Sequence, residues 1–340
     1  MTKVSINGFG RIGRLFLRQA LSSGGTGLEI VAINDLADLE NLAYLFKYDT
    51  VYGVYDKNVE AKGNNLVVDG EKIAFTQIKD PKELPWKKQG VDIVVEATGV
   101  FSAYEKAKVH IEAGAKRVII TAPAKDSDGA EGKTVLVGVN EGELEKVALT
   151  SNGSCTTNAT SPVISVLSEN PGIEKAVLST VHGYTATQGI VDGPAHGGDF
   201  RRGRAAAMNI VPSTTGAAIA VARAIKEMEG KFDGVAFRVP VVAGSIADIT
   251  FISKRETSVE EVNKTLKKAS EDPRWEGILA VTEDPLVSSD ILGRPYGAIV
   301  DLSFTKVIDN NLVKVLSWYD NEWGYVSTLL KHVINASKLV

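Results

Sequence analysis

The first half of the chain alternates short apolar runs with longer segments in which apolar residues recur at helical spacing. The apolar runs predict strands, and the periodic segments predict helices. Strand, helix and strand in this order are typical of a parallel sheet with helices on both faces. We expect strands at Lys3–Asn7, Glu29–Asn34, Asp92–Glu96, Val118–Thr121 and Thr134–Val137, and helices at Arg11–Leu21, Leu39–Phe46 and Ser102–Ala113.

Residues 51–90 depart from this pattern, because they are rich in Lys, Asp and Gly and carry short strand-like runs at Leu66–Val68 and Lys72–Phe75. We interpret them as an insertion. In the second half several strand signals follow one another with no helix between them, which favours a mixed or largely antiparallel sheet. These expected strands are Lys175–Val181, Gly234–Val242, Ser245–Lys254, Gly297–Phe304 and Leu312–Tyr319.

Helices are also expected in the second half. Ser213 is a candidate N-cap for a helix that ends near Gly230. Residues Ser258–Glu261 have the spacing of a capping box. Asn321–Leu339 has an apolar stripe and predicts a last amphipathic helix.

Length and composition agree with two folded domains. The 340 residues suit about two domains of ordinary size, and 44% hydrophobic with 24% charged residues excludes a disordered, collagenous or coiled-coil chain. We predict an α/β protein with a Rossmann-type, doubly wound parallel sheet in residues 1–154. An α+β domain with a mixed or antiparallel sheet follows in residues 155–320.

Charge and cysteine content exclude further classes. Subtracting 42 acidic from 38 basic residues gives a net charge of −4, so we expect no nucleic-acid partner. No apolar run reaches the roughly 18 residues that span a bilayer, and the first residues enter a folded-looking motif with no room for a signal peptide. We expect a cytoplasmic protein with no membrane partner. Cys155 is the one cysteine, which excludes an internal disulfide and a multi-cysteine zinc site, and we expect no metal.

A dinucleotide fingerprint follows the first predicted strand. Gly8-Phe9-Gly10-Arg11-Ile12-Gly13 fits the pattern G-x-G-x-x-G at the start of a predicted helix. Its glycines serve a tight turn, the approach of backbone to a pyrophosphate, and close packing of helix on strand. Asp35 ends the next strand, where a carboxylate accepts hydrogen bonds from a ribose and repels a 2′-phosphate. The cofactor expected is therefore NAD.

Cys155 lies in the polar stretch Ser151–Asn158, which leads into a helix-like segment. A thiol at a helix N-terminus has a lowered pKa, and we expect this of Cys155. His182 closes a predicted strand and is the best candidate base, since His110, His196 and His332 have poorer settings. A Cys–His pair with a nicotinamide suggests aldehyde oxidation, in which a hemithioacetal on the cysteine is oxidised to a thioester.

Several motifs together resemble the glyceraldehyde-3-phosphate dehydrogenase family, from Ile6 to the C-terminus and in family order. They are Ile6–Arg14, Ser151–Asn158, His182–Thr185, Asn209–Gly216, Phe237–Pro240 and Trp318–Glu322. The resemblance implies oxidation of D-glyceraldehyde 3-phosphate to 1,3-bisphosphoglycerate with NAD and inorganic phosphate, in glycolysis or gluconeogenesis. Cys155 is the implied nucleophile and His182 the implied base.

The resemblance also implies two phosphate sites and a cofactor set. Thr185 and Arg238 are implied for the phosphate of the substrate, with Thr156 among the substrate-binding residues. Ser154, Thr215, Gly216 and one arginine of the cluster Arg201-Arg202-Gly203-Arg204, taken here as Arg201, are implied for the attacking phosphate. The implied cofactor residues are Gly8, Gly10, Arg11, Ile12, Gly13, Asp35, Thr98, Gly99, Thr121 and Asn321. Asn321 would bind the nicotinamide amide, so the helix 321–340 is expected to return to the first domain.

Some positions depart from the family pattern. Ala159 stands where many members have a second cysteine, Ile219 where a lysine is common, and Val241–Ser245 replaces a more usual Thr/Pro/Asn stretch. Leu36 and Pro194 resemble members that prefer NAD.

Family members are homotetramers, and the long irregular segment Gly183–Met208 has the length to reach a neighbouring cofactor site. Three alternatives stay open. Erythrose-4-phosphate dehydrogenase shares the framework but resolves its thioester with water. Aspartate-semialdehyde dehydrogenase needs other arginines and a different cysteine motif. A redox-sensing NAD-binding protein built on Cys155 is the third.

Overall fold

The computed structural model describes residues 1–195 and 198–340. His196 and Gly197, which belong to the segment Gly183–Met208, lie outside the described residues. The chain divides into two compact units. The first comprises Met1–Val135, Glu141–Gly153 and Leu329–Val340, and the second comprises Leu136–Asn140 and Ser154–Thr328.

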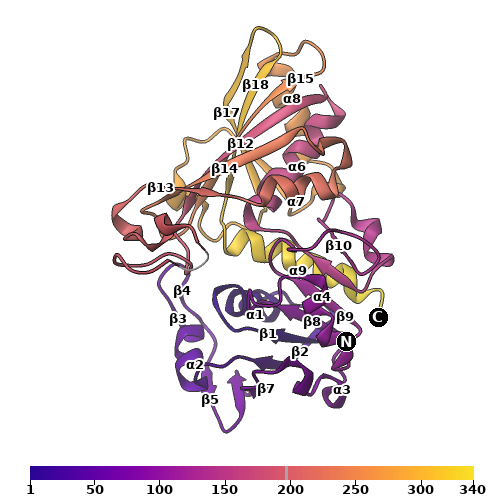
Figure 1. Cartoon of the computed structure of the whole chain (residues 1–340), viewed down its shortest axis with the longest axis vertical. Coiled ribbons are helices and arrows are strands. Elements are labelled where there is room, and N and C mark those ends of the chain that lie inside the picture. The colour runs from indigo at the N-terminus through magenta and orange to yellow at the C-terminus, as the bar shows by residue number, and fades with distance from the viewer. Residues whose placement is uncertain (196–197) are drawn as a thin grey trace. The chain divides into compact units, whose positions relative to one another are not determined.

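The first unit is built on a nine-stranded sheet in the order β10-β11-β9-β8-β1-β2-β7-β6-β5 (Figure 1). Strands β10 to β7 in this order are parallel, and β6 and β5 pair antiparallel at one edge. The predicted parallel sheet is therefore confirmed. The strands are β1 (Thr2–Asn7), β2 (Leu28–Asn34), β5 (Val59–Ala61), β6 (Asn65–Val68), β7 (Glu71–Thr76), β8 (Ile93–Glu96), β9 (Arg117–Ile120), β10 (Gly132–Thr134) and β11 (Leu149–Ser151).

The segment interpreted as an insertion is continuous with this sheet, because β5, β6 and β7 form its edge. A short ribbon of β3 (Tyr48–Asp49) and β4 (Gly53–Val54) comes before β5 in the chain. The helices are α1 (Arg11–Ser22), α2 (Leu39–Lys47), α3 (Trp86–Gln89), α4 (Tyr104–Ala107) and α5 (Val109–Glu112). The prediction of one helix over Ser102–Ala113 is wrong, since the chain forms two short helices that meet at Lys108.

The second unit holds a seven-stranded sheet in the order β13-β14-β12-β15-β18-β17-β16. The pairs β12/β14 and β16/β17 are parallel and the others antiparallel, so the predicted mixed sheet is confirmed. The strands are β12 (Ile173–Gly183), β13 (Val211–Thr214), β14 (Phe232–Val239), β15 (Ser245–Ser253), β16 (Leu279–Thr282), β17 (Ala298–Ile308) and β18 (Leu312–Tyr319).

Helices cover one face of this sheet. The core is formed by apolar side chains of the strands and of α6 (Cys155–Glu169), α7 (Ala217–Ala224) and α8 (Val259–Ser270) (Figure 1). The last helix, α9 (Trp323–Ser337), begins in the second unit, and its residues from Leu329 belong to the first. Short 3-10 helices lie at Pro81–Glu83, Glu141–Glu145, Phe200–Gly203, Ala206–Met208, Lys226–Met228, Pro273–Trp275 and Ser288–Ile291.

One cap prediction is wrong, and the other is confirmed in part. Ser213 belongs to β13, and α7 begins after Gly216 and ends at Ala224, well before Gly230. Pairing of β13 with β14 takes Ser213 into the sheet, which outweighs its preference for a cap. The capping box at Ser258 is half formed, because Ser258 accepts the N–H of Glu261 but the Glu261 carboxylate binds Arg255 and Thr257.

Across the described parts of the chain, no helix is long and apolar enough to cross a membrane. The same residues contain no group of three or more His, Cys, Asp or Glu side chains placed to hold a metal ion.

Candidate functional site

A cavity of about 480 Å³ lies at the carboxyl ends of β1, β2 and β8 in the first unit. The chain runs from β1 to β2 on one side and reaches β8 on the other, so β1 and β8 flank the point where the strand order reverses. Open α/β sheets bind ligands at such a point. Asn7, Gly8, Gly10, Asp35, Thr98 and Phe101 are among the residues that line the cavity.

The three fingerprint glycines have distinct environments. Gly8 has a φ of +96°, and a Cβ there would lie 2.6 Å from the backbone nitrogen of Thr98. A Cβ on Gly13 would lie 2.2 Å from the carbonyl oxygen of Gly8, so α1 packs against the turn only because Gly13 has no side chain. A Cβ on Gly10 meets none of the described atoms within 4 Å. Gly10 therefore leaves open the backbone surface at the start of α1.

These donors and acceptors fit a dinucleotide. Gly10 is the N-cap of α1, and no described side chain caps it, so the first N–H groups of the helix are suited to phosphate oxygens. Each Asp35 carboxylate oxygen accepts one backbone N–H, from Phe9 at 2.7 Å and from Ala37 at 2.9 Å. Because a carboxylate oxygen accepts two hydrogen bonds, Asp35 keeps acceptor capacity for ribose hydroxyls.

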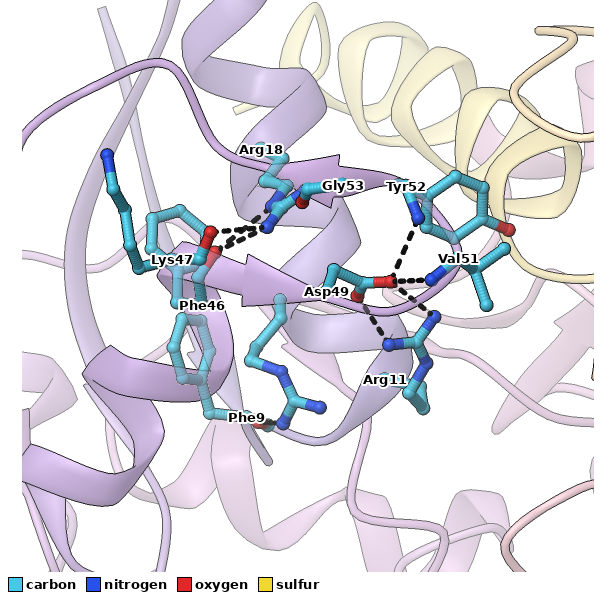
Figure 2. A network of polar contacts seen from close by, with 10 residues as sticks. Phe9, Arg11, Arg18, Phe46, Lys47, Asp49, Val51, Tyr52 and Gly53 are labelled. Atoms are coloured by element: carbon cyan, nitrogen blue, oxygen red, sulfur yellow. Dashed lines mark hydrogen bonds and ion pairs between the residues drawn. The ribbon is translucent and has the colours of Figure 1, made fainter.

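Arg11 is held by a neighbouring loop (Figure 2). Its guanidinium pairs with Asp49, and the same carboxylate accepts the backbone N–H groups of Val51 at 2.9 Å and Tyr52 at 3.1 Å. These contacts hold the pKa of Asp49 below its usual value against the opposing effect of burial. The Arg11 side chain is thus engaged within the first unit, while its backbone starts α1.

The remaining predicted cofactor residues divide between the units. Thr98 and Gly99 follow β8, and Thr121 follows β9, where its hydroxyl donates to the carbonyl of Glu96 at 3.1 Å. Ile12 lies in the first turn of α1. Asn321 belongs to the second unit and is described with it below.

Cys155 is the first residue of α6, whose N-cap is Ser154. The Ser154 hydroxyl accepts the N–H of Thr157, and the Thr157 hydroxyl accepts the N–H of Ser154, both at 3.1 Å. This reciprocal cap fixes the turn that carries the thiol. Although its neighbours in sequence are polar, Cys155 also packs against the apolar core of the second unit.

The alternation of buried and exposed side chains along β12 determines where His182 lies. Leu178, Thr180 and His182 are buried on the face that α6 covers, while Val177 and Val181 point away and are exposed. His182 therefore faces the start of α6, and its Nε2 lies 3.3 Å from the Cys155 Sγ. The structure thus brings together the two residues for which the sequence predicts a nucleophile and a base.

The other ring nitrogen of His182 has two neighbours of opposite kind. Nδ1 lies 2.6 Å from the carbonyl oxygen of Gly183, which can only accept, and it also contacts the guanidinium of Arg238, which can only donate. Arg238 is the neighbour of His182 across the parallel pair β12/β14, and it donates to the Gly183 carbonyl at 3.3 Å. In the tautomer that directs the Nδ1 proton at Gly183, Nε2 is the acceptor and faces the thiol.

Burial keeps both groups neutral. Burial, with a smaller effect of the Arg238 charge, lowers the pKa of His182 to about 3. Burial also raises the pKa of the Cys155 thiol, and Arg238 and Thr156 offset part of that rise. The predicted lowering of the Cys155 pKa is therefore wrong, because the cost of burying the thiolate exceeds the stabilisation from its surroundings. The pair is suited to proton transfer from Sγ to Nε2 when a substrate reacts.

Tyr319, which the sequence analysis did not single out, connects the two elements of the pair. Its hydroxyl lies 2.9 Å from that of Thr156 on α6 and 2.8 Å from that of Thr180 on β12. Alternation along β18 indicated that this residue is buried, and a buried tyrosine hydroxyl requires a partner.

Asn321 is oriented by the segment that departs from the family pattern. Its Oδ1 accepts the N–H of Gly244 at 3.0 Å and the hydroxyl of Ser245 at 2.9 Å, which leaves its NH₂ group as a donor. Ser245 in turn accepts the N–H of Gly183 at 3.2 Å. A chain of hydrogen bonds therefore joins Asn321 to the strand of His182.

The predicted anion-binding residues lie on several elements of the second unit. Thr215 and Gly216 lead into α7, where the Thr215 hydroxyl accepts the N–H of Ala217 at 3.2 Å. Thr185 follows β12, and its hydroxyl lies 2.9 Å from that of Thr187.

The arginines of the cluster differ. Arg201 and Arg204 are exposed and pair with Asp199 and Asp192. Arg202 is half-buried, donates to the Ser213 hydroxyl at 2.8 Å, and lies near enough to lower the pKa of Arg238, although burial lowers it more.

A Rossmann-type unit with a dinucleotide cavity and a mixed-sheet unit with a Cys–His pair define the class of nicotinamide-dependent oxidoreductases that act through a cysteine. Residues 2–104 match the family model of the glyceraldehyde 3-phosphate dehydrogenase NAD binding domain, and residues 154–321 match that of its C-terminal domain. This chain belongs to the glyceraldehyde-3-phosphate dehydrogenase family.

Similar curated proteins carry the same name. The chain is 49% identical to glyceraldehyde-3-phosphate dehydrogenase of Borreliella burgdorferi over 330 residues, which cover 95% of this chain and 96% of that protein. It is 47% identical to glyceraldehyde-3-phosphate dehydrogenase 1 of Kluyveromyces lactis over 98% of this chain and 100% of that protein. The Bacillus subtilis glyceraldehyde-3-phosphate dehydrogenase 2 is 46% identical over 97% and 96%.

Proposed function

We propose that this chain oxidises D-glyceraldehyde 3-phosphate to 1,3-bisphosphoglycerate, with NAD as cofactor and inorganic phosphate as second substrate, in glycolysis or gluconeogenesis. One observation carries the proposal: the Cys155 Sγ lies 3.3 Å from His182 Nε2, and the other ring nitrogen of His182 contacts the Gly183 carbonyl at 2.6 Å. That geometry supplies a nucleophile with an oriented base.

Cys155 and His182 would act in sequence. As Sγ forms a bond to the aldehyde carbon, Nε2 takes the thiol proton. The backbone N–H of Cys155 at the start of α6 and the resulting imidazolium are donors for the developing oxyanion. NAD, when bound, accepts hydride and so supplies the oxidation. The thioester that remains on Cys155 is then attacked by a phosphate oxygen, the carbon–sulfur bond breaks, and the acyl phosphate leaves.

Two anion sites follow from this reaction. Thr185 and Arg238 would bind the phosphate of the substrate, supported by the place of Arg238 beside His182. Ser154, Thr156, Thr215 and Gly216 would serve the reacting groups and the attacking phosphate with one arginine. Arg201 was expected in that role, and its pairing with Asp199 favours half-buried Arg202 instead. Arginine forks and hydroxyls suit phosphate oxygens.

For the cofactor, we propose that residues 1–154 with helix 321–340 bind NAD and that residues 155–320 carry the chemistry. The cofactor residues are Gly8, Gly10, Arg11, Ile12, Gly13, Asp35, Thr98, Gly99, Thr121 and Asn321. No metal, nucleic acid or membrane enters the proposal, and a cytoplasmic location agrees with the unpaired Cys155.

A homotetramer is part of the proposal. The sheet face of the second unit that points away from its helices carries exposed apolar side chains, including Val177, Val181, Val235 and Leu312. An exposed apolar face on an antiparallel or mixed sheet is suited to contact between subunits.

The decisive experiment measures NADH formation from glyceraldehyde 3-phosphate and NAD with and without inorganic phosphate. Multiple turnovers that need phosphate are expected. Equal turnover without phosphate would mean that water resolves the thioester, as in an erythrose-4-phosphate dehydrogenase.

A further inference from the structure

A buried carboxylate lies beside the nucleotide cavity. Glu96 ends β8, is 2% exposed, and accepts four hydrogen bonds. Asn7 Nδ2 and His110 Nε2 lie 2.6 and 2.9 Å from its Oε2. The backbone N–H of Thr98 lies 2.9 Å from Oε1, which the Thr98 hydroxyl also contacts. A carboxylate has about four acceptor positions, so all of them are used.

On one side, the backbone fixes the direction of these bonds. The N–H of Ile78 can only donate, and it lies 2.9 Å from Asn34 Oδ1. The Asn34 amide nitrogen therefore donates to Asn7 Oδ1 at 2.8 Å. This leaves the Asn7 amide nitrogen as the group that faces Glu96.

On the other side, Trp86 fixes the tautomer of His110. The indole N–H, which can only donate, lies 3.2 Å from His110 Nδ1. Nδ1 is thus an acceptor, the ring proton lies on Nε2, and Nε2 donates to Glu96. The Asn7 amide nitrogen, the Thr98 backbone N–H and His110 Nε2 therefore all donate to Glu96.

The groups that Glu96 and His110 contact form part of the cavity wall. The Thr98 hydroxyl donates to Glu96 and accepts the N–H of Val100 at 3.0 Å, which forms the turn at Gly99, where φ is +73°. The Phe101 ring packs edge-on against His110, with 5.8 Å between ring centroids. Asn7, Thr98, Val100 and Phe101 all line the cavity.

We infer that Glu96 and His110 are positioning residues for the dinucleotide, and that the relay Trp86–His110–Glu96 sets the loop from Thr98 to Phe101 in the form that binds NAD. This inference rests on the proposed function. Neither residue touches the reacting atoms, and both act through Asn7, Thr98 and Phe101.

The first variant is Glu96→Gln, which keeps the shape and removes two acceptor positions. Whichever way the amide is turned, its NH₂ faces obligate donors. NAD affinity, measured by titration calorimetry, is expected to fall by about tenfold or more, since a bond to a buried charged group is lost. The kcat at saturating NAD should change by less than about threefold, because the effect is on binding. Glu112→Gln, on the exposed side of α5, is the matched control and should bind NAD like the wild type.

The second variant is Trp86→Phe, which removes the indole N–H and frees His110 to carry its proton on Nδ1. Nε2 can then accept from the new amide, so the double variant Glu96→Gln/Trp86→Phe should recover about half of the lost affinity on a logarithmic scale. A loss of stability alone predicts the opposite, since two damaged sites would bind more weakly than one.

A third readout uses neither NAD nor a variant. Nitrogen-15 NMR of the labelled wild-type protein should show His110 as the Nε2–H tautomer. Observation of the Nδ1–H tautomer would overturn the relay. This NMR measurement remains informative even if the Glu96→Gln variant does not fold. If the Glu96→Gln variant folds and binds NAD with the same affinity as the wild type, the inference is overturned and the proposed function is left intact. A wild-type protein that binds no NAD would overturn both.

Discussion

The Tyr319 ring stands edge-on to the His182 imidazole, with 5.9 Å between ring centroids. Its hydroxyl simultaneously bonds Thr156 on the helix of Cys155 and Thr180 on the strand of His182. Tyr319 comes from neither of these elements. It therefore holds together the two elements whose separation sets the distance from sulfur to nitrogen.

Tyr319→Phe should consequently weaken both the fold and the reaction. The hydroxyl of Thr156 loses a buried partner, whereas that of Thr180 keeps the carbonyl of Ile246 at 3.2 Å. Loss of one to two buried hydrogen bonds predicts a decrease of about 1–3 kcal/mol in the free energy of unfolding. Urea unfolding measures this, and kcat under saturating substrates should fall with KM for NAD unchanged. An unaltered kcat would show that the clamp is only structural.

Cys155→Ser should abolish turnover while NAD still binds. A serine hydroxyl in the same place is a far weaker nucleophile than a thiol with His182 as base. His182→Asn should lower kcat by about 10²–10⁴-fold, the usual contribution of a general base. Stopped-flow NADH formation and NAD calorimetry on the same preparations separate the two effects. Appreciable steady turnover by Cys155→Ser would refute the nucleophile assignment.

Arg238→Gln should change the pH dependence of both groups. The positive charge of Arg238 lowers the pKa of Cys155 and that of His182, so its removal raises both. The thiolate should then form only at higher pH, and the imidazole should take up a proton at less acidic pH. Thiolate absorbance in the ultraviolet and the rate of alkylation against pH measure the first change. A thiolate titration that moves to lower pH would contradict the electrostatic role of Arg238.

Much of this arrangement was predictable because it follows from local pattern. The strand signal at Lys175–Val181 predicted a strand, and in the structure the alternation of buried and exposed residues along β12 decides which face the His182 imidazole lies on. The spacing of Gly8, Gly10 and Gly13 predicted a turn and helix that the structure contains.

Local sequence pattern does not show how segments far away in the chain override a residue's local preference. Ser213 has the chemistry of an N-cap, yet the neighbouring strand β14 draws it into the sheet. The position of Cys155 at the start of a helix predicts a lowered pKa, but elements far away in sequence bury the thiol and reverse the direction. His110 gives no sign in sequence of its partners Trp86 and Glu96, which lie 24 and 14 residues away.

Asp35→Asn should narrow the preference for NAD over NADP. The charge that repels a 2′-phosphate is removed, while a side-chain oxygen remains to accept one of the two N–H groups of Phe9 and Ala37. The ratio of kcat/KM for the two cofactors measures the change, with an expected decrease of about tenfold. Asp38→Asn at the N-cap of α2 is a suitable control, because its side chain binds Asn41. An unchanged ratio would move the selectivity to another position, such as Pro194.

Acid should destabilise the protein through a histidine remote from the Cys–His pair in sequence. His332 is fully buried, with Nδ1 and Nε2 each 3.0 Å from side-chain oxygens of Asn152 and Thr150. Burial, aided by the charge of Arg117, lowers its pKa to about 3, against about 6.5 for an unfolded histidine. Between these values the unfolded chain binds a proton that the folded chain does not, so the free energy of unfolding falls as pH decreases below about 6.5.

The slope due to this residue approaches about 1.4 kcal/mol per pH unit. His332→Gln removes the titrating group and keeps an amide for hydrogen bonding, so its unfolding free energy should depend on pH by about one proton less than that of the wild type between pH 6 and 5. Urea unfolding at several pH values measures both slopes, and His182 contributes equally to each. Parallel slopes would show that the proton taken up on unfolding belongs to other groups, since the substitution changes only position 332.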